Sequence, residues 1–120
     1  MNENERESIG RIEVAPEVLA TIAHYATLRL EGVSKMASIP ADAARLLRRA
    51  TRHNGILLNI VEDKVTFDIY VIMHPHVNIM ETSKNLQAAV SDAIVKMVGI
   101  PVTAVNVHVE DVIYGQSDVS

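Results

Sequence analysis

Two apolar runs joined by a short charged turn constrain the fold of this chain more than any other feature. In residues 65–73 apolar and polar side chains alternate, which is the period-2 pattern of a β-strand with one face in a core. Residues 56–61 form a second apolar run just before it. With Asp63 and Lys64 as the turn, six apolar side chains share one face: Ile60 opposite Phe67, Leu58 opposite Ile69 and Ile56 opposite Val71. A connection one residue longer or shorter would turn one strand over, so the pattern predicts a β-hairpin with an even-numbered loop.

The outward face of this hairpin is less polar than a solvent-facing sheet surface. In the same register Leu57 lies opposite Tyr70, and Ile72 follows two residues later. An apolar patch of this kind needs a cover or marks an interaction surface. We therefore expect one of two arrangements. Either the arginine-rich segment covers the patch through Leu46 and Leu47, or Leu57, Tyr70 and Ile72 bind a protein partner.

Two long helices are predicted from capping residues and apolar periodicity. Pro16 suits a first helical turn, and that helix should end at Gly32, which tolerates the left-handed conformation. Asn78 and Glu81 have the spacing of a capping box, and Gly99 should close the second helix. The buried face of the second helix is expected to comprise Ile79, Leu86, Ala89, Val90, Ala93, Ile94 and Met97.

Short strands and one weaker helix complete the predicted order. Strands are expected at residues 11–14, 33–37 and 103–109, and a helical segment should run from residue 40 to about residue 54. The helices are too few to cover both faces of a sheet. The chain is therefore expected to be an α+β protein, with a mixed sheet of four to five strands, two main helices on one face and a short extra helix.

Length and composition predict a single domain. We expect it to span residues 9–114, between disordered polar tails at residues 1–8 and 115–120. The chain contains no cysteine, its polar start lacks the apolar core of a secretory signal, and no apolar run reaches the roughly 18 residues of a membrane span. A cytoplasmic protein is expected, peripheral to the inner face of the membrane if a partner holds it there.

The four arginines Arg45, Arg48, Arg49 and Arg52 are the most concentrated charge in the chain. Residues 40–53 carry a formal charge of +3 within a chain of net charge −4. On a helix these arginines would form one cationic stripe, suited to phosphate or carboxylate groups on an anionic surface or nucleic acid. A merely solvated helix face is the favoured interpretation, because the negative net charge and the scattered aromatic residues argue against a nucleic-acid binder.

No catalytic or cofactor-binding pattern occurs. The serines lie outside any G-x-S-x-G elbow, and the five glycines form no phosphate-binding loop. His74, His76 and His108 could bind zinc in principle, but they have no cysteine nearby and no carboxylate at a ligand spacing. We expect no enzymatic activity, no cofactor and no bound metal.

Five short segments occur in order along almost the whole chain. They are Gly-x-Ile-x-Val-Ala-x-Glu-Val at residues 10–18, Glu-Gly-Val-x-x-Met at 31–36, Asp-Ile-Tyr-Val-Ile at 68–72, Ile-x-Glu with Gln-x-x-Val within 79–90, and Val-Asn-Val-x-Val at 105–109. Together they resemble the alkaline-shock or envelope-stress-response protein family of mostly Gram-positive bacteria. The chain departs from that family's pattern at residues 74–76 and in the arginine-rich segment.

The resemblance implies a non-enzymatic role in envelope homeostasis or stress, exerted through protein partners. A membrane-anchored partner and a homo-oligomer both fit this expectation, whereas nucleic acid does not. Members of the family have no established catalytic residues to assign to positions in this chain.

Overall fold

The computed structural model describes residues 9–112, and the predicted tails at residues 1–8 and 115–120 lie outside this range. Its helices and strands, in chain order, are α2 (Pro16–Leu28), β1 (Val33–Met36), α3 (Ala41–Leu46), β2 (Thr51–His53), β3 (Ile56–Val61), β4 (Lys64–Met73), α4 (Ile79–Val98) and β5 (Ala104–Val112). The predicted α+β class is confirmed. No helix within residues 9–112 is both long enough and apolar enough to cross a membrane.

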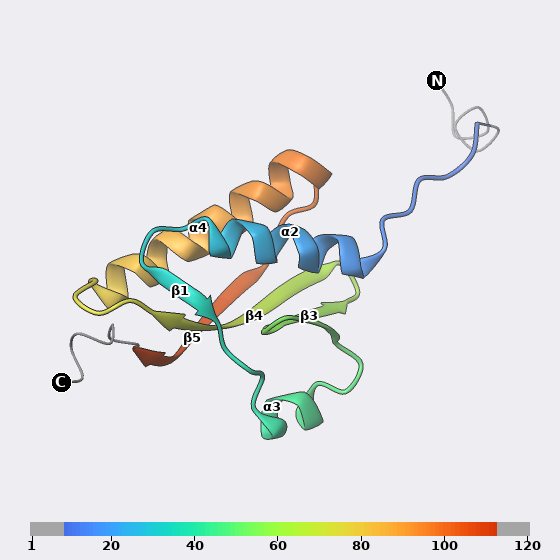
Figure 1. Ribbon diagram of the computed structural model, residues 1–120. Helices are drawn as coiled ribbons and strands as arrows, with labels where there is room; N and C mark the ends of the chain where they lie inside the picture. Colours follow the sequence, from blue (N-terminus) through green and yellow to red (C-terminus); the bar gives the residue numbers. More distant parts are fainter. Residues whose placement is uncertain (1–8, 113–120) are drawn as a thin grey trace.

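Strand β4 is the centre of a five-stranded sheet. Its first part pairs antiparallel with β3 and its last part pairs antiparallel with β1, while β5 runs parallel to it on the other edge. The short strand β2 extends the sheet beyond β3. Figure 1 shows α2 and α4 side by side over one face of this mixed sheet, with α3 on the opposite side.

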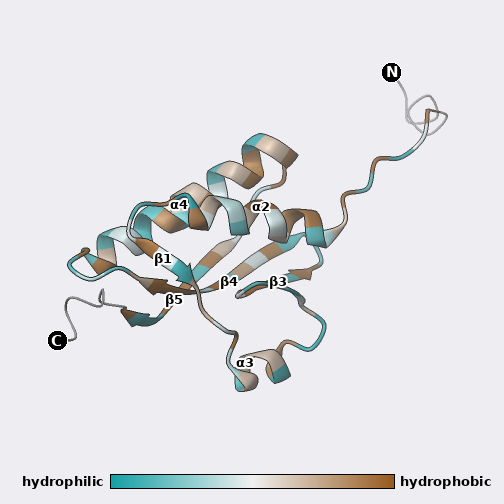
Figure 2. Ribbon diagram, viewed as in Figure 1, coloured by the Kyte–Doolittle hydropathy of each residue, from teal (hydrophilic) through white to brown (hydrophobic). Residues whose placement is uncertain are grey.

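The main core fills the space between the sheet and the two long helices. Phe67 is fully buried at its centre, with Leu19 of α2 and Ile94 of α4 among its neighbours in the core. Figure 2 shows the same division, because the brown hydrophobic positions concentrate on the central strands while teal positions recur along the helices. Burying each such large side chain contributes about 1.5 to 3 kcal/mol to stability.

The hairpin of β3 and β4 has a different register from the predicted one. Its turn is Glu62 and Asp63, so each predicted cross-strand pair was wrong by two residues. The observed pairs include Ile60 with Val65, Leu58 with Phe67 and Ile56 with Ile69. Glu62 has a φ of 57°, which allows a two-residue turn and leaves Lys64 free to enter the strand. A shift of two residues keeps every side chain on its predicted face, so the even-numbered loop is confirmed.

Three other predicted boundaries were wrong. Residues 11–14 are in no strand, and α2 ends at Leu28, where hydrogen bonds from Arg29 and Leu30 tighten the last turn. Gly32 instead packs against α4, where an added Cβ would lie 3.1 Å from the Thr82 side chain. The helix after Pro40 stops at Leu46 because β2 forms soon afterwards.

Helix α4 begins and ends where its capping residues predict. The Asn78 Oδ1 accepts a hydrogen bond from the backbone N–H of Glu81 at 2.9 Å, and Gly99 adopts the left-handed conformation with a φ of 80°. Its predicted buried face is confirmed at Leu86, Val90 and Ile94, but its two ends are exposed.

Candidate interaction surfaces

The patch formed by Leu57, Tyr70 and Ile72 is covered within the chain. Leu57 is fully buried and Tyr70 is 5% exposed, in a second small core to which Leu47 contributes. The remaining residues of this core are Ala37, Ile39, Ala43 and Ala50. Of the two expected arrangements, the structure shows the covered one: Leu57 and Tyr70 are buried beneath the α3 segment, and Ile72 is partly buried beside them. Leu46 takes no part in the cover and is 85% exposed.

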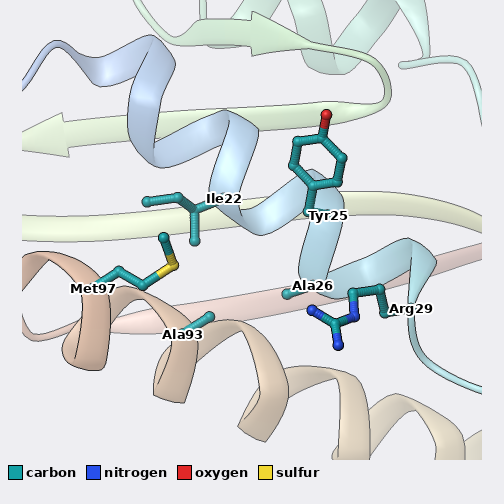
Figure 3. Close-up of a pocket in the computed structure, with 6 residues that line it drawn as sticks. All are labelled: Ile22, Tyr25, Ala26, Arg29, Ala93 and Met97. Atoms are coloured by element: carbon teal, nitrogen blue, oxygen red, sulfur yellow. The ribbon is translucent and has the colours of Figure 1, made fainter.

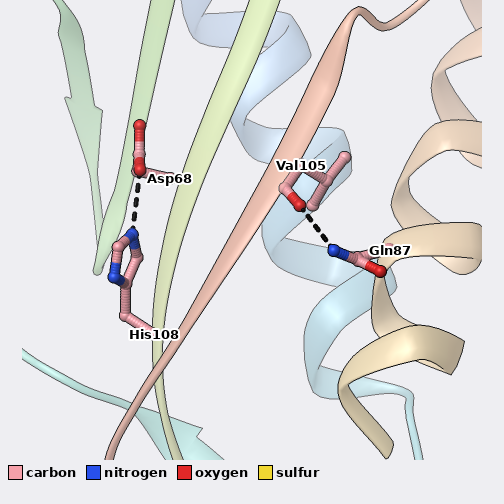
Figure 4. A network of polar contacts seen from close by, with 4 residues as sticks. All are labelled: Asp68, Gln87, Val105 and His108. Atoms are coloured by element: carbon pink, nitrogen blue, oxygen red, sulfur yellow. Dashed lines mark hydrogen bonds and ion pairs between the residues drawn. The ribbon is translucent and has the colours of Figure 1, made fainter. Parts of the chain in front are cut away.

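Next to this cover, β4 and β5 bring together a cluster of three side chains, Asp68, Tyr70 and His108. The cluster was not predicted, because β4 and β5 are far apart in the sequence. The Nε2 atom of His108 lies 2.9 Å from Oδ1 of Asp68, and the imidazole stacks on the ring of Tyr70 with 4.4 Å between centroids (Figure 4). Asp68 lies opposite Leu57 of β3 on one side and opposite Asn106 of β5 on the other. The parallel pairing of β4 with β5 creates the cluster, because it sets Tyr70 opposite His108.

The charges around Tyr70, Asp68 and His108 favour the contacts that these side chains make with one another. Burial raises the pKa of Tyr70, and the nearby carboxylates of Asp68 and Glu110 raise it further, so the neutral phenol is favoured. The Asp68 side chain is only 16% exposed, and an ion pair or hydrogen bond with His108 satisfies it. Within residues 9–112, no three histidine or acidic side chains are grouped closely enough to hold a metal ion.

The four arginines do not share one helix face. All are exposed, but only Arg45 lies in α3, while Arg52 is on β2 and the other two lie between these elements. Arg45 forms an ion pair with Asp42 at 3.3 Å, and Arg52 donates to the backbone oxygen of Ala44 at 2.8 Å. The predicted cationic stripe was therefore wrong in its geometry, because the early end of α3 spreads these side chains.

An apolar groove between α2 and α4 was not foreseen. It has a volume of about 280 Å³ and is lined by Ile22, Tyr25, Ala26, Arg29, Ala93 and Met97. Figure 3 shows Ile22 and Met97 pointing toward each other across the groove, with Ala26 and Ala93 lying between the helices. Met97 is 70% exposed and Tyr25 is 65% exposed, although Met97 had been expected in the buried face. The small residues Ala26 and Ala93 were the available signal, since they leave room between two adjacent helices.

A side-chain hydrogen bond joins α4 to strand β5 of the sheet. The Gln87 Nε2 donates to the Val105 backbone oxygen at 3.0 Å (Figure 4). Together with the core contacts, it holds α4 above β5. The groove thus has one wall, α4, that is firmly attached to the sheet.

Comparison with known protein families gives a match over nearly the whole chain. The family profile of alkaline shock protein 23, described as having a cell envelope-related function, matches residues 4–114. No solved structure matched the chain.

Similar proteins occur in Streptococcus pyogenes and Bacillus subtilis. The protein Spy1535 of Streptococcus pyogenes serotype M6 is 36% identical over 108 residues, covering 89% of this chain and 82% of that protein. The protein YqhY of Bacillus subtilis is 22% identical over 108 residues, covering 89% of this chain and 80% of that protein. A second streptococcal protein, Spy1614, is 30% identical over 106 residues, covering 86% and 88% of the two chains.

Proposed function

The chain belongs to the alkaline shock protein 23 family, whose function is related to the cell envelope, and on that premise we propose that it is a non-enzymatic interaction protein of the cytoplasm. It acts by binding a protein partner at the inner side of the envelope. A membrane-anchored partner would bring it to the membrane surface. The groove between α2 and α4 is the site at which that partner binds.

The observation that supports this proposal is the exposure of apolar side chains around the groove. Tyr25 and Met97 are both more than half exposed, and they flank a small-residue floor that a side chain from another protein fits. Tyrosine, methionine and arginine are enriched at protein interfaces, and Arg29 gives this groove a polar end. The sheet-borne patch, in contrast, is already covered by the α3 segment.

The Asp68 and His108 pair supports a structural role rather than a chemical one. Its carboxylate is shielded, and its imidazole packs its face against Tyr70. A general base in a nucleophilic mechanism would need a hydroxyl or thiol nucleophile within hydrogen-bonding distance.

Site-specific photo-crosslinking in the bacterium that encodes this chain tests the proposal. A benzoyl-phenylalanine in place of Tyr25 should crosslink to an envelope-associated protein, and adding Met97→Glu should abolish that product. The matched control places the same crosslinker at Val95, which is also exposed on α4 but lies outside the groove. A product formed equally from Val95, or one that survives Met97→Glu, would show that the groove is not the partner site.

A further inference from the structure

Leu46 lies in solvent at the end of α3, where its side chain takes no part in the core. It is 85% exposed, whereas the adjacent Leu47 packs into the small core with Leu57 and Tyr70. Figure 1 shows α3 standing off from the sheet, on the side opposite to α2 and α4. A single exposed leucine is common on protein surfaces, so its surroundings decide whether it has a role.

The surroundings of Leu46 are cationic. Arg48 and Arg49 are exposed, and within residues 9–112 neither has an acidic side chain as an ion-pair partner. Together with Leu46, Leu47 and Asn59, they line a hollow of about 230 Å³. The amide of Asn59 is neutral, so nothing in this lining offsets the two guanidinium charges.

The end of the hairpin of β3 and β4 extends this surface beyond Asn59. Alternate residues of a strand point the same way, and Val61 lies opposite Lys64, so Asn59, Val61 and Lys64 share one face. Val61 is 56% exposed, and Lys64 is exposed as well. A step of two residues along a strand spans about 7 Å, which places both side chains next to the hollow.

The acidic side chains nearest in the sequence do not neutralise this surface. Glu62 and Asp63 of the hairpin turn line a cavity with Leu19 of α2, on the other side of the sheet. Asp42 is already paired with Arg45, at 3.3 Å. A chain of net charge −4 thus carries a local surface of unpaired positive charge beside exposed apolar side chains.

We propose that this surface binds an anionic lipid bilayer directly. We call it the α3 face, and it comprises Leu46, Arg48, Arg49, Val61 and Lys64. Leu46 enters the boundary between headgroups and acyl chains, and the basic side chains pair with headgroup phosphates. A bilayer supplies both an apolar phase and a layer of phosphates. Nucleic acid supplies only the phosphates, and its bases would need exposed aromatic rings to stack on, whereas Tyr70 is buried beneath the α3 segment.

This orientation leaves the groove between α2 and α4 free. The two helices lie on the opposite side of the sheet from α3, so they do not face the bilayer in this arrangement (Figure 1). A protein partner in the groove and a bilayer at the α3 face can therefore bind the same molecule at once.

Tryptophan fluorescence tests the insertion of residue 46, because the native chain contains no tryptophan. Leu46→Trp is mixed, at about 0.01 M salt, with vesicles of equal parts phosphatidylcholine and phosphatidylglycerol. Its emission should shift to shorter wavelength and should be quenched by brominated acyl chains. Vesicles of phosphatidylcholine alone should leave the emission unchanged. The control Met80→Trp places the probe at another largely exposed residue, on α4, and should not respond to either vesicle.

Removal of charge tests the contacts with phosphate. In the Leu46→Trp background, Arg48→Gln/Arg49→Gln should weaken vesicle binding by at least about tenfold, because each basic residue near an anionic surface contributes about fivefold. Lys84→Gln/Lys96→Gln removes the same charge from exposed positions on α4 and should have a much smaller effect.

Three results would overturn the proposal: no spectral shift or quenching at residue 46, an equal response from the control position on α4, or equal effects of the two double variants. Arginine-dependent binding without quenching would mean that the α3 segment contacts headgroup phosphates without inserting, which also contradicts it. The vesicles contain no protein, so these results are independent of partner binding in the groove.

Discussion

At the scale of single residues, Tyr70 links the chemistry of the sheet to its stability. Burial and two neighbouring carboxylates raise its pKa above the ordinary value of 10.0, so the folded state holds the phenolic proton more tightly than the unfolded state does. This contribution to stability is fully present below pH 10 and is lost as the pH rises through the folded-state pKa.

We therefore expect Tyr70→Phe to remove a tyrosine whose pKa in the folded protein is raised by burial and by the two carboxylates. Absorbance at 295 nm, recorded against pH on the folded protein, should rise less above pH 10 in the variant than in the wild type. The free energy of unfolding of the variant should also fall less steeply above pH 10 than that of the wild type. An unchanged titration curve in the most alkaline range would show that Tyr70 is more hydrated than the structure indicates.

Two glycines have nearly the same left-handed backbone conformation but different surroundings. Replacing each by alanine therefore distinguishes the cost of the backbone conformation from the cost of steric contact. Gly55 and Gly99 have φ of 81° and 80°. An added Cβ at Gly55 would lie 2.6 Å from the Ala37 backbone oxygen, whereas one at Gly99 would meet nothing within 4 Å.

Gly99→Ala should thus lower the free energy of unfolding by about 1 to 2 kcal/mol, the cost of a left-handed alanine. Gly55→Ala should lose about 1 to 3 kcal/mol more, because the strand contacts must also move. Urea denaturation of both variants checks this difference. Equal losses would mean that the backbone at Ala37 and the strands β1 and β4 move easily away from Gly55.

At the scale of elements, the α3 segment covers the second face of the sheet through a few apolar contacts. Adjacent leucines provide a matched pair, because Leu47 packs into the small core and Leu46 points to solvent. Leu47→Ala should lower the free energy of unfolding by about 1 to 2 kcal/mol, below the range for fully buried leucines because Leu47 is half-buried. Leu46→Ala should change it by less than about 0.5 kcal/mol.

Chemical denaturation monitored by circular dichroism distinguishes these variants. A similar small loss in both would mean that the segment detaches from Leu57 and Tyr70 in solution. In that case the sheet-borne patch would become accessible, and its role in partner binding would have to be reconsidered.

At the scale of the whole molecule, the arginines retain only part of the anionic attraction that the sequence suggests. Arg45 and Arg52 already have partners in the chain, and within residues 9–112 neither Arg48 nor Arg49 forms an ion pair. At about 0.01 M salt we expect weak binding to anionic lipid vesicles, which should fade as screening sets in near 0.15 M.

The double variant Arg48→Gln/Arg49→Gln should reduce this binding more than Arg45→Gln/Arg52→Gln does. Vesicle co-sedimentation at several salt concentrations measures both. If the two double variants behave alike, net charge alone governs the attraction and no local site exists.

The sequence by itself determined which residues face the core and what class of fold they build. The periodicity of β4 and the capping residues of α4 depend on neighbours close in the chain, and both were confirmed. The core-facing residues of the hairpin were predicted correctly although the register was wrong. A shift of two residues leaves every side chain on the same face of the sheet.

Only the tertiary structure decided which residues from distant parts of the chain lie next to one another. The pairing of β4 with β5 brought His108 to Asp68 and Tyr70, and helix packing opened the groove at Ala26 and Ala93. The early end of α3 was likewise a tertiary outcome, since β2 gains ladder hydrogen bonds from β3 that no local propensity could report. Residues 11–14 show the limit most clearly. Their pattern predicts a strand, but a strand needs a neighbouring edge, and within residues 9–112 the fold leaves these residues unpaired.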